Sequence, residues 1–437
     1  MQLVAYGAQD IYLTGNPQIT FFKVVYRRHT NFAMEAIEQT FMGQVDFGKR
    51  VSVLISRNGD LIHRMYFQTE LPEICSLVSG RWTDNVGDHL IRTVEVEIGG
   101  QRIDKQYGDW LHIWNALSLP VGLQVGYDRM TGHVLELTDG LTSGKPRYTL
   151  FIPFQFWFNR NAGLALPLIA LQYHEVKINM ELRTFAELWI GTADNQDGCA
   201  GVSVGAPCPT QCGLGQSSLW VDYIYLDTDE RRRFAQVSHE YLIEQLQFNG
   251  DETVTATNNK LRLTFNHPTK EIVWIIQKDC FVARPTVDNS FLGNQWSNYQ
   301  IFPAANDSFA EENFSQTAGS PNVLFKIQLN GHDRFQARIG RYFNEVQTYQ
   351  HHTRTPISVG IYVYSFALRP EEHQPSGSVN FSRIDNANLI FTLDPDVFVC
   401  DPAAQSPDAT TAKMRVYAVN YNVLRVMSGM GGVAYSN

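Results

Sequence analysis

The sequence has few charged residues and no long apolar run. Charged side chains make up 18% of its 437 residues, against roughly 25% in an ordinary globular protein. No window reaches the roughly 18 consecutive apolar residues that a membrane helix needs. No basic segment followed by an apolar stretch comes after Met1, so a secretory signal is not expected either. These absences exclude a helical membrane protein and predict synthesis in the cytosol.

Cysteine is also scarce, with six residues in the chain. A cytosolic protein is expected to keep its thiols reduced. Cys199, Cys208 and Cys212 form one irregular group, whereas structural zinc sites usually combine two paired knuckles. His351 and His352 are neighbours that would point to opposite faces of an extended chain, so we predict solvated loop residues. We expect free thiols and no metal or other cofactor, with a thiolate metal site as the weaker alternative.

Positive charge is outnumbered, because 35 Lys and Arg stand against 44 Asp and Glu and give a net charge of −9. Affinity for nucleic acid depends on neutralising phosphates with Lys and Arg, so direct binding of nucleic acid is not expected. Basic residues gather at 23–29 and at 231–233, and neither group has the interleaved aromatics of a nucleic-acid groove. We predict that Arg231, Arg232 and Arg233 lie on a short solvated helix.

What the sequence does contain is short alternation of apolar and polar residues. Hydrophobic residues make up 44% of the chain and aromatic residues 12%. Segments such as 51–55 and 176–182 alternate with the period of two that is typical of half-buried strands. Helical periodicity is confined to short pieces such as 109–119 and 229–235. The fold class predicted from these patterns is all-β, with short helices and long loops.

A long internal duplication organises these strands. Four pairs of segments match in the same order along the chain, which supports two copies of one domain whose loops differ in length. Two of the segments break at Gly100 and Gly331, where a hairpin turn needs a positive φ angle. The matching segments are 51–62 with 261–272, 94–104 with 325–335, 176–182 with 387–393, and 223–231 with 417–425.

The duplication predicts the domain boundaries. Residues 1–19 form an amino-terminal arm, 20–229 the first domain, 230–238 a linker and 239–437 the second domain. Each domain has about 200 residues and about eight recognisable strands. This size suits a β-sandwich or jelly roll.

Enzyme signatures are poor. The sequence at 239–243, HEYLI, has Ile where a zinc-binding HExxH motif needs its second His. Glu95 and Glu97 share one strand face about 7 Å apart, a spacing comparable to that of glycosidase carboxylates. We interpret them as a solvated outer face, because the two carboxylates lie beside each other and not across a cleft. The second copy has Lys326 and Gln328 at these positions, which excludes a duplicated catalytic pair. We therefore expect no enzyme and no catalytic residue.

Three asparagines occur in sequons for glycosylation, at Asn306, Asn313 and Asn380. Asn380 precedes a predicted strand, whereas the other two lie in a long polar loop. Asn306 and Asn313 are therefore the candidate glycosylation sites.

Several motifs spread over nearly the whole chain resemble a known family, the major capsid proteins of large nucleocytoplasmic DNA viruses, most closely the chlorella virus type. They follow one another in the order in which the family has them. The motifs are GAQDIYLTGNPQITFFKVVYRRHTNF at 7–32, IGGQRID at 98–104, GLALPLIALQYHEVK at 163–177, EYLIEQLQF at 240–248, NHPTK at 266–270, FSRIDNA at 381–387 and NYNVLRVMSGMGG at 420–432.

The resemblance implies a tandem double jelly roll of two eight-stranded sandwiches. It implies a homotrimer that forms the pseudo-hexagonal building block of an icosahedral virion shell, made and assembled in the host cytoplasm, close to an internal virion membrane. The implied partners are other copies of the chain, neighbouring capsomers and minor capsid proteins. The candidate residues of the assembly arm are Asp10, Thr14, Lys23, Tyr26, Arg27 and Arg28.

The long connections match the family least well, and we expect them to form outward-facing towers. They are 72–90, 120–147, 184–219, 280–320 and 394–412. Two alternatives to the capsid function stay open at this point. One is a jelly-roll protein attached to a virion, namely a minor capsid, spike or lectin-like protein, and the other is a carbohydrate-active enzyme that uses Glu95 and Glu97.

Overall fold

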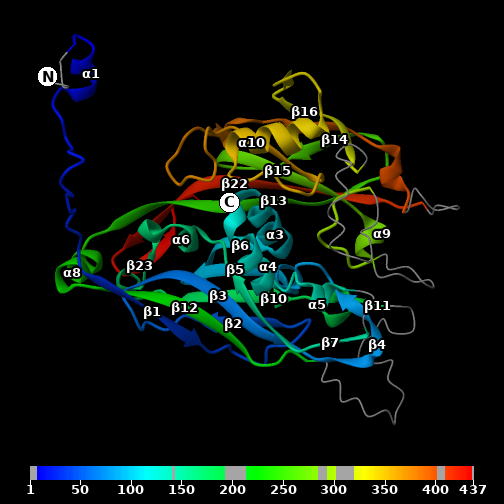
Figure 1. Ribbon diagram of the computed structural model, residues 1–437, viewed down its shortest axis with the longest axis horizontal. Helices are drawn as coiled ribbons and strands as arrows, with labels where there is room; N and C mark the ends of the chain where they lie inside the picture. The colour runs from blue at the N-terminus through cyan, green and yellow to red at the C-terminus, as the bar shows by residue number, and fades with distance from the viewer. Residues whose placement is uncertain are drawn as a thin grey trace, which may run out of the picture.

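The chain forms two strand-rich bodies, shown one above the other in Figure 1. The structure is a computed structural model, and it describes residues 7–139, 143–191, 213–283, 293–301, 319–400 and 409–435. No helix in these ranges is longer than the 11 residues of α3 (Gly108–Ser118). The predicted all-β class with short helices is confirmed.

The first body is a sandwich of two antiparallel sheets. One sheet has the strand order β1-β12-β3-β8, and the short strand β9 (Leu166–Pro167) also pairs with β3. The other sheet has the order β2-β10-β5-β6. The strands are β1 (Phe32–Gln39), β12 (Ser217–Leu226), β3 (Leu61–Leu71) and β8 (Tyr148–Pro153), then β2 (Arg50–Leu54), β10 (Val176–Leu182), β5 (Ile91–Ile98) and β6 (Gln101–Tyr107).

The second body repeats this topology. Its sheets have the orders β13-β22-β15-β19 and β14-β21-β16-β17, with β18, β20 and β23 paired at their margins. The main strands are β13 (His239–Val254), β22 (Ala412–Met427), β15 (Pro268–Lys278) and β19 (Ile361–Ser365), then β14 (Asn258–Leu263), β21 (Ala387–Leu393), β16 (Asn322–Leu329) and β17 (His332–Asp333). The marginal strands are β18 (Arg338–Ile339), β20 (Val379–Asn380) and β23 (Met430–Val433).

The two sets of eight strands correspond one to one in chain order and in sheet position, so the predicted duplication is a duplication of topology. All four matched sequence pairs fall on corresponding strands. The hairpin between β5 and β6 turns at Gly99 and Gly100, with φ of 57° and 83°. The equivalent hairpin turns at Asn330 and Gly331, with φ of 50° and 81°. Two successive positive φ values define the turn whose twist suits a β-hairpin, and Gly and Asn tolerate them best.

Three connections of the first body, which the sequence predicted to form outward-facing towers, contain regular structure. Strand β4 (Ile74–Trp82) pairs with β7 (Ser143–Lys145) and β11 (Trp189–Gly191) in a small third sheet. Trp82, Trp189 and Leu188 are buried beside this sheet. The sequence did not indicate this sheet, because a few large apolar side chains that need cover are spread among polar turn residues.

Short helices lie in the arm and in the connections between strands. The α-helices are α1 (Asp10–Thr14), α2 (Val86–Leu90), α4 (Gln124–Thr131), α5 (Leu135–Thr138), α6 (Trp157–Arg160), α7 (Phe185–Leu188), α8 (Thr228–Gln236), α9 (Asp279–Val282) and α10 (Gln347–His351). The 3-10 turns are η1 (Val121–Leu123), η2 (Ala162–Leu164), η3 (Leu168–Ala170), η7 (Phe381–Arg383) and η8 (Pro395–Phe398), and the π-helical turn η6 (Tyr342–Val346) leads into α10.

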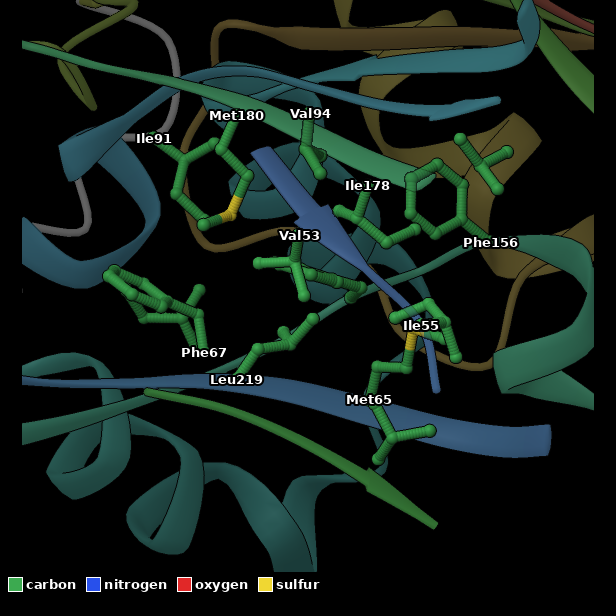
Figure 2. Close-up of a cluster of buried hydrophobic side chains, with 14 of the residues drawn as sticks. Val53, Ile55, Met65, Phe67, Ile91, Val94, Phe156, Ile178, Met180 and Leu219 are labelled. Carbon is green, nitrogen blue, oxygen red and sulfur yellow. The ribbon is translucent and has the colours of Figure 1, made fainter. Parts of the chain in front are cut away.

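Each sandwich has its own apolar core. In the first, Val53 and Ile178 of one sheet face Met65, Phe67 and Leu219 of the other (Figure 2). Strand β10 buries every second residue along its whole length, as the alternation predicted. In the second core, the rings of Trp274 and Phe325 stack with centroids 4.1 Å apart.

Candidate assembly site

The amino-terminal arm leaves the first sandwich and carries α1 well away from both bodies (Figure 1). Within α1, Asp10 and Thr14 contact each other, because the Thr14 hydroxyl donates to the Asp10 carbonyl oxygen at 2.7 Å. The Asp10 carboxylate also accepts from the Gly7 backbone N–H at 2.6 Å. These contacts hold one helical turn at the tip of the arm.

The rest of the arm is extended and exposed as far as β1, which begins at Phe32. Residues 20–31, which the sequence placed in the first domain, therefore continue the arm. Lys23, Tyr26, Arg27 and Arg28 lie in this stretch and are all exposed.

The arm is rich in exposed apolar side chains. Phe21 is 90% exposed and Phe22 is 98% exposed. A soluble monomer rarely exposes so many large apolar groups together, so such a segment marks an interaction site. The sequence motif indicated an arm, but it did not indicate that the apolar side chains of the arm are exposed. The exposed apolar residues are Ile11, Tyr12, Leu13, Ile19, Phe21, Phe22, Val24, Val25 and Tyr26.

Glu95 and Glu97 do not form a solvated pair. Glu95 is buried, and its carboxylate lies 3.0 Å from Lys105 Nζ, 3.6 Å from Arg50 Nη2 and 3.9 Å from Arg102 Nη1. Glu97 instead accepts a hydrogen bond from the Asn179 side chain at 3.1 Å. At the expected outer face, Glu95 of β5 is thus paired with three cations, Arg50 from β2 and Arg102 and Lys105 from β6.

The expectation of solvated histidines at the end of α10 was wrong for His352. Its side chain is fully buried, with Nε2 3.0 Å from Glu271 Oε2 and Nδ1 2.9 Å from Glu371 Oε1. Burial alone would lower the pKa of His352, but the two carboxylates raise it to about 9. His352 is therefore a buried cation at neutral pH. Adjacency in sequence gave no signal of this, because both carboxylates are distant along the chain.

The three arginines at 231–233 lie on a short exposed helix, as predicted, but one of them is also held by a buried carboxylate. Arg231, Arg232 and Arg233 lie on α8, whose residues are exposed. Arg231 Nε, however, contacts the buried carboxylate of Asp60 at 2.8 Å, which also accepts from the Leu226 backbone N–H. The helix is thereby attached to the first sandwich.

Other sequence candidates lie outside the described residues, namely Asn306, Asn313, Cys199, Cys208 and Cys212. Among the described cysteines, Cys280 and Cys400 are free thiols. In the described ranges, no three or more His, Cys, Asp or Glu side chains are grouped so as to hold a metal ion. The helices of the same ranges are all too short or too polar to span a bilayer.

The sequence did not reveal the contact that joins the two sandwiches. Helix α3 of the first half lies between the two bodies (Figure 1) and packs its apolar face on the outer face of the β13-β22-β15-β19 sheet. Strand β15 is consequently buried on both faces. The side chains in this cluster are Trp110, Ile113, Trp114 and Leu117 from α3 and Val273, Ile275, Tyr299, Ile361, Val363, Tyr417 and Val419 from the second half.

A buried carboxylate lies at the edge of this apolar contact. Asp109, in the first turn of α3, has Oδ2 2.5 Å from Arg415 Nη1 of β22 and Oδ1 3.3 Å from Arg183 Nη2. His89 Nδ1 lies 3.3 Å from Oδ1 as well. Burial by itself raises the pKa of Asp109, but Arg415 and Arg183 hold it well below its usual range. Asp109 is thus a permanent anion shared by both halves of the chain.

A second ionic contact crosses the junction nearby. Arg160 of α6 lies 2.9 Å from Glu244 of β13, and Glu244 lies 2.6 Å from Lys270 of β15. Burial raises the pKa of Glu244, but Arg160, His373 and Lys270 outweigh burial and lower it to about 2. The Leu246 backbone N–H also donates to Asp104 at 3.0 Å. Charges and backbone hydrogen bonds therefore fix the register between the two bodies.

Comparison with known proteins gives one consistent family. The model described as "Major capsid protein N-terminus" matches residues 20–227, and the model described as "Large eukaryotic DNA virus major capsid protein" matches residues 230–432. The major capsid protein of Phaeocystis pouchetii virus is 50% identical, with 100% of this chain and 99% of the relative covered. That of Paramecium bursaria Chlorella virus 1 is 46% identical over the same shares.

Solved structures agree with these matches. A chain of the quasi-atomic model of the PBCV-1 virus capsid is 39% identical and superimposes with a TM-score of 0.75, covering 96% of this chain and all of the other. The Faustovirus major capsid protein is 12% identical and superimposes with a TM-score of 0.72, covering 97% and 94%. The latter shows that the fold is kept where little sequence identity remains.

Replacing Asp109 by Asn tests the junction. The change leaves the buried Arg183 guanidinium without its carboxylate partner and leaves Arg415 with Asp251 alone, so we expect a loss of about 3–5 kcal/mol in the free energy of unfolding. Glu240→Gln is the matched control, because it breaks the exposed pair of Glu240 with Arg425 on β13 and β22, worth about 0–1 kcal/mol. Urea unfolding measures both. Equal losses in the two variants would contradict the role given to Asp109.

Because the two carboxylates raise the pKa of His352, we expect the free energy of unfolding to depend on pH. The native pKa of about 9 exceeds that of an unfolded histidine, so this stabilisation is complete below about pH 6.5 and is lost as the pH rises through 9. The difference corresponds to on the order of 3 kcal/mol. His352→Gln should flatten the fall in unfolding free energy between pH 6 and 10, whereas His351→Gln, beside it, should keep the wild-type slope. Parallel slopes in all three proteins would rule the prediction out.

Proposed function

The chain belongs to the family of large eukaryotic DNA virus major capsid proteins and is a structural protein of the icosahedral virion shell; we propose that its working unit is a homotrimer. The observation that carries this proposal is the duplicated topology, β1-β12-β3-β8 with β2-β10-β5-β6, and its repeat in the second half. Three such chains place six similar sandwiches around one threefold axis. A trimer of this outline can occupy a pseudo-hexagonal position in a shell.

The junction supports the same proposal. A capsomer keeps a hexagonal outline only if the two sandwiches of each chain hold a fixed angle. Helix α3, Asp109 and the contact of Arg160 with Glu244 provide a junction that is both apolar and charge-paired. We further propose that the first domain spans 20–229 and the second 239–437, with 230–238 as linker, most of which lies on α8. Within the first of these ranges, residues 20–31 belong to the arm and the sandwich itself begins with β1.

The arm is the surface that we propose for contacts beyond the trimer. Its exposed apolar side chains suit burial against neighbouring capsomers or minor capsid proteins. Lys23, Arg27 and Arg28 add positive charge to a chain whose net charge is −9, so the arm is complementary to the acidic remainder of other copies. The same net charge argues against direct contact with the genome.

We also propose that the protein has no catalytic role and that it is made and assembled in the host cytoplasm. The carboxylates whose spacing suggested a glycosidase are Glu95 and Glu97. The Glu95 carboxylate lies in ion-pair contact with Lys105, Arg50 and Arg102, and Glu97 accepts a hydrogen bond from Asn179, so both side chains already have partners within their own sheet.

The oligomeric state tests the trimer. Static light scattering on the purified protein at micromolar concentration should give three times the monomer mass of 49.6 kDa, because obligate interfaces of this class bury large areas. A stable monomer under these conditions would defeat the proposal. A dimer would count equally against it.

The arm has its own test, the double substitution Phe21→Ser with Phe22→Ser. We expect trimers to form normally but the fraction found in ordered arrays to fall at least about tenfold, because two apolar anchors are lost. Phe21→Tyr with Phe22→Tyr is the control, since it keeps the aromatic area. Electron microscopy of assembled material gives the array fraction. Undiminished arrays in the serine variant would show that the arm is dispensable.

A further inference from the structure

We propose that Cys280 and Cys400 are a modification site, a thiol pair that is reduced during assembly and closes to a disulfide when the protein meets an oxidising environment. Cys280 lies in α9, directly after β15, and Cys400 follows η8. The two residues are about 120 positions apart in the chain, so only the fold brings them together.

Hydrogen bonds hold the two segments side by side. Lys278 Nζ donates to the Val399 carbonyl oxygen at 2.6 Å, so the side chain two residues before Cys280 contacts the backbone of the residue just before Cys400. The Asp279 backbone N–H donates to the Thr411 carbonyl oxygen at 2.8 Å. The Cys280 backbone N–H lies 3.3 Å from Thr410 Oγ1. Three stretches of chain are thus fixed around the thiols before any sulfur chemistry takes place.

The thiols themselves are in contact. Cys280 and Cys400 share a side-chain hydrogen bond, and both residues are partly exposed. Burial first, and then the contact with Cys400, raise the pKa of the Cys280 thiol to about 12. Because the thiolate is the reactive form, this pair reacts slowly at neutral pH. Partial exposure nevertheless admits a small oxidant.

The oxidant is a low-molecular-weight disulfide, which accepts the two electrons that the protein thiols lose. One protein thiolate attacks a sulfur of the small disulfide, forms a mixed disulfide and releases one small thiolate. The second protein thiol loses its proton and attacks the protein sulfur of the mixed disulfide, which releases the other small thiolate. Two protein thiols are oxidised, one small disulfide is reduced to two thiols, and the two protons pass to the released thiolates.

The timing rests on the proposed function. A shell assembled in a reducing cytoplasm keeps the pair as thiols, and a particle released from the cell meets oxidising surroundings. The bond would then join the end of β15 to the segment after η8 and close a loop of about 120 residues. Long closed loops gain the most from a crosslink in the chain-entropy account. The second sandwich would become more resistant to unfolding only after the subunit is in place.

The experiment treats the purified full-length protein with oxidised glutathione at pH 7 and pH 8.5 and then digests it without reduction. Mass spectrometry should find a peptide that links Cys280 to Cys400, formed faster at the higher pH. The midpoint of thermal unfolding should rise by about 5–10 °C on oxidation and fall back after dithiothreitol. Cys280→Ser and Cys400→Ser should each abolish the linked peptide and the shift, whereas Cys75→Ser should preserve both.

Two outcomes would overturn the proposal. One is recovery of Cys280 and Cys400 as alkylatable thiols after oxidation of the folded protein. The other is Cys280 linked to a cysteine other than Cys400. Because the linked peptide is measured in whatever oligomer the protein forms, failure of the trimer leaves this result intact, and absence of the disulfide leaves the trimer intact.

Discussion

The burial of Asp109 between Arg415 and Arg183 is the interaction on which the rest of the molecule depends. It lies at the start of α3, so it fixes the helix that fills the space between the two sandwiches. An ion pair of this kind adds little net stability over an apolar substitute, but it is costly to break and permits few alternative arrangements. The apolar contact of α3 supplies affinity, and the ion pair specifies the angle at which the two bodies meet.

The duplication gives two similar sandwiches, but the connection between equivalent strands is used differently in each. Between β6 and β8, helix α3 leaves its own sandwich and packs on the sheet of the other. Between β17 and β19, η6 and α10 stay with their own sandwich, where Phe343 packs against Trp274. A shared topology keeps the outlines alike, as a hexagonal capsomer requires, while one altered connection makes the two copies a single unit.

Buried charge is the recurring feature that patterns of sequence did not indicate. His352 between Glu271 and Glu371, and Glu95 among three cations, were both expected to be solvated. Glu244, which is buried beside Lys270, gave no signal in the sequence. In the sequence, a charged residue that pairs with a distant partner cannot be told from one that faces water. Whether a charge can be buried depends on which opposite charges the fold places beside it. Cys280 and Cys400 gave no signal of their contact either, because they are about 120 positions apart in the chain.

The sequence by itself determined the β class, the eight strands of each copy, the hairpin turns at Gly100 and Gly331, and the family. These features depend on local periodicity, on backbone angles that few residues tolerate, and on motifs that are contiguous in the chain. Only the tertiary structure decided that 72–90 and 184–191 contribute to a third sheet, that the arm extends to β1, and that Asp109 joins the two bodies. Each of these depends on contacts between residues far apart in sequence, whose free energy no local pattern encodes.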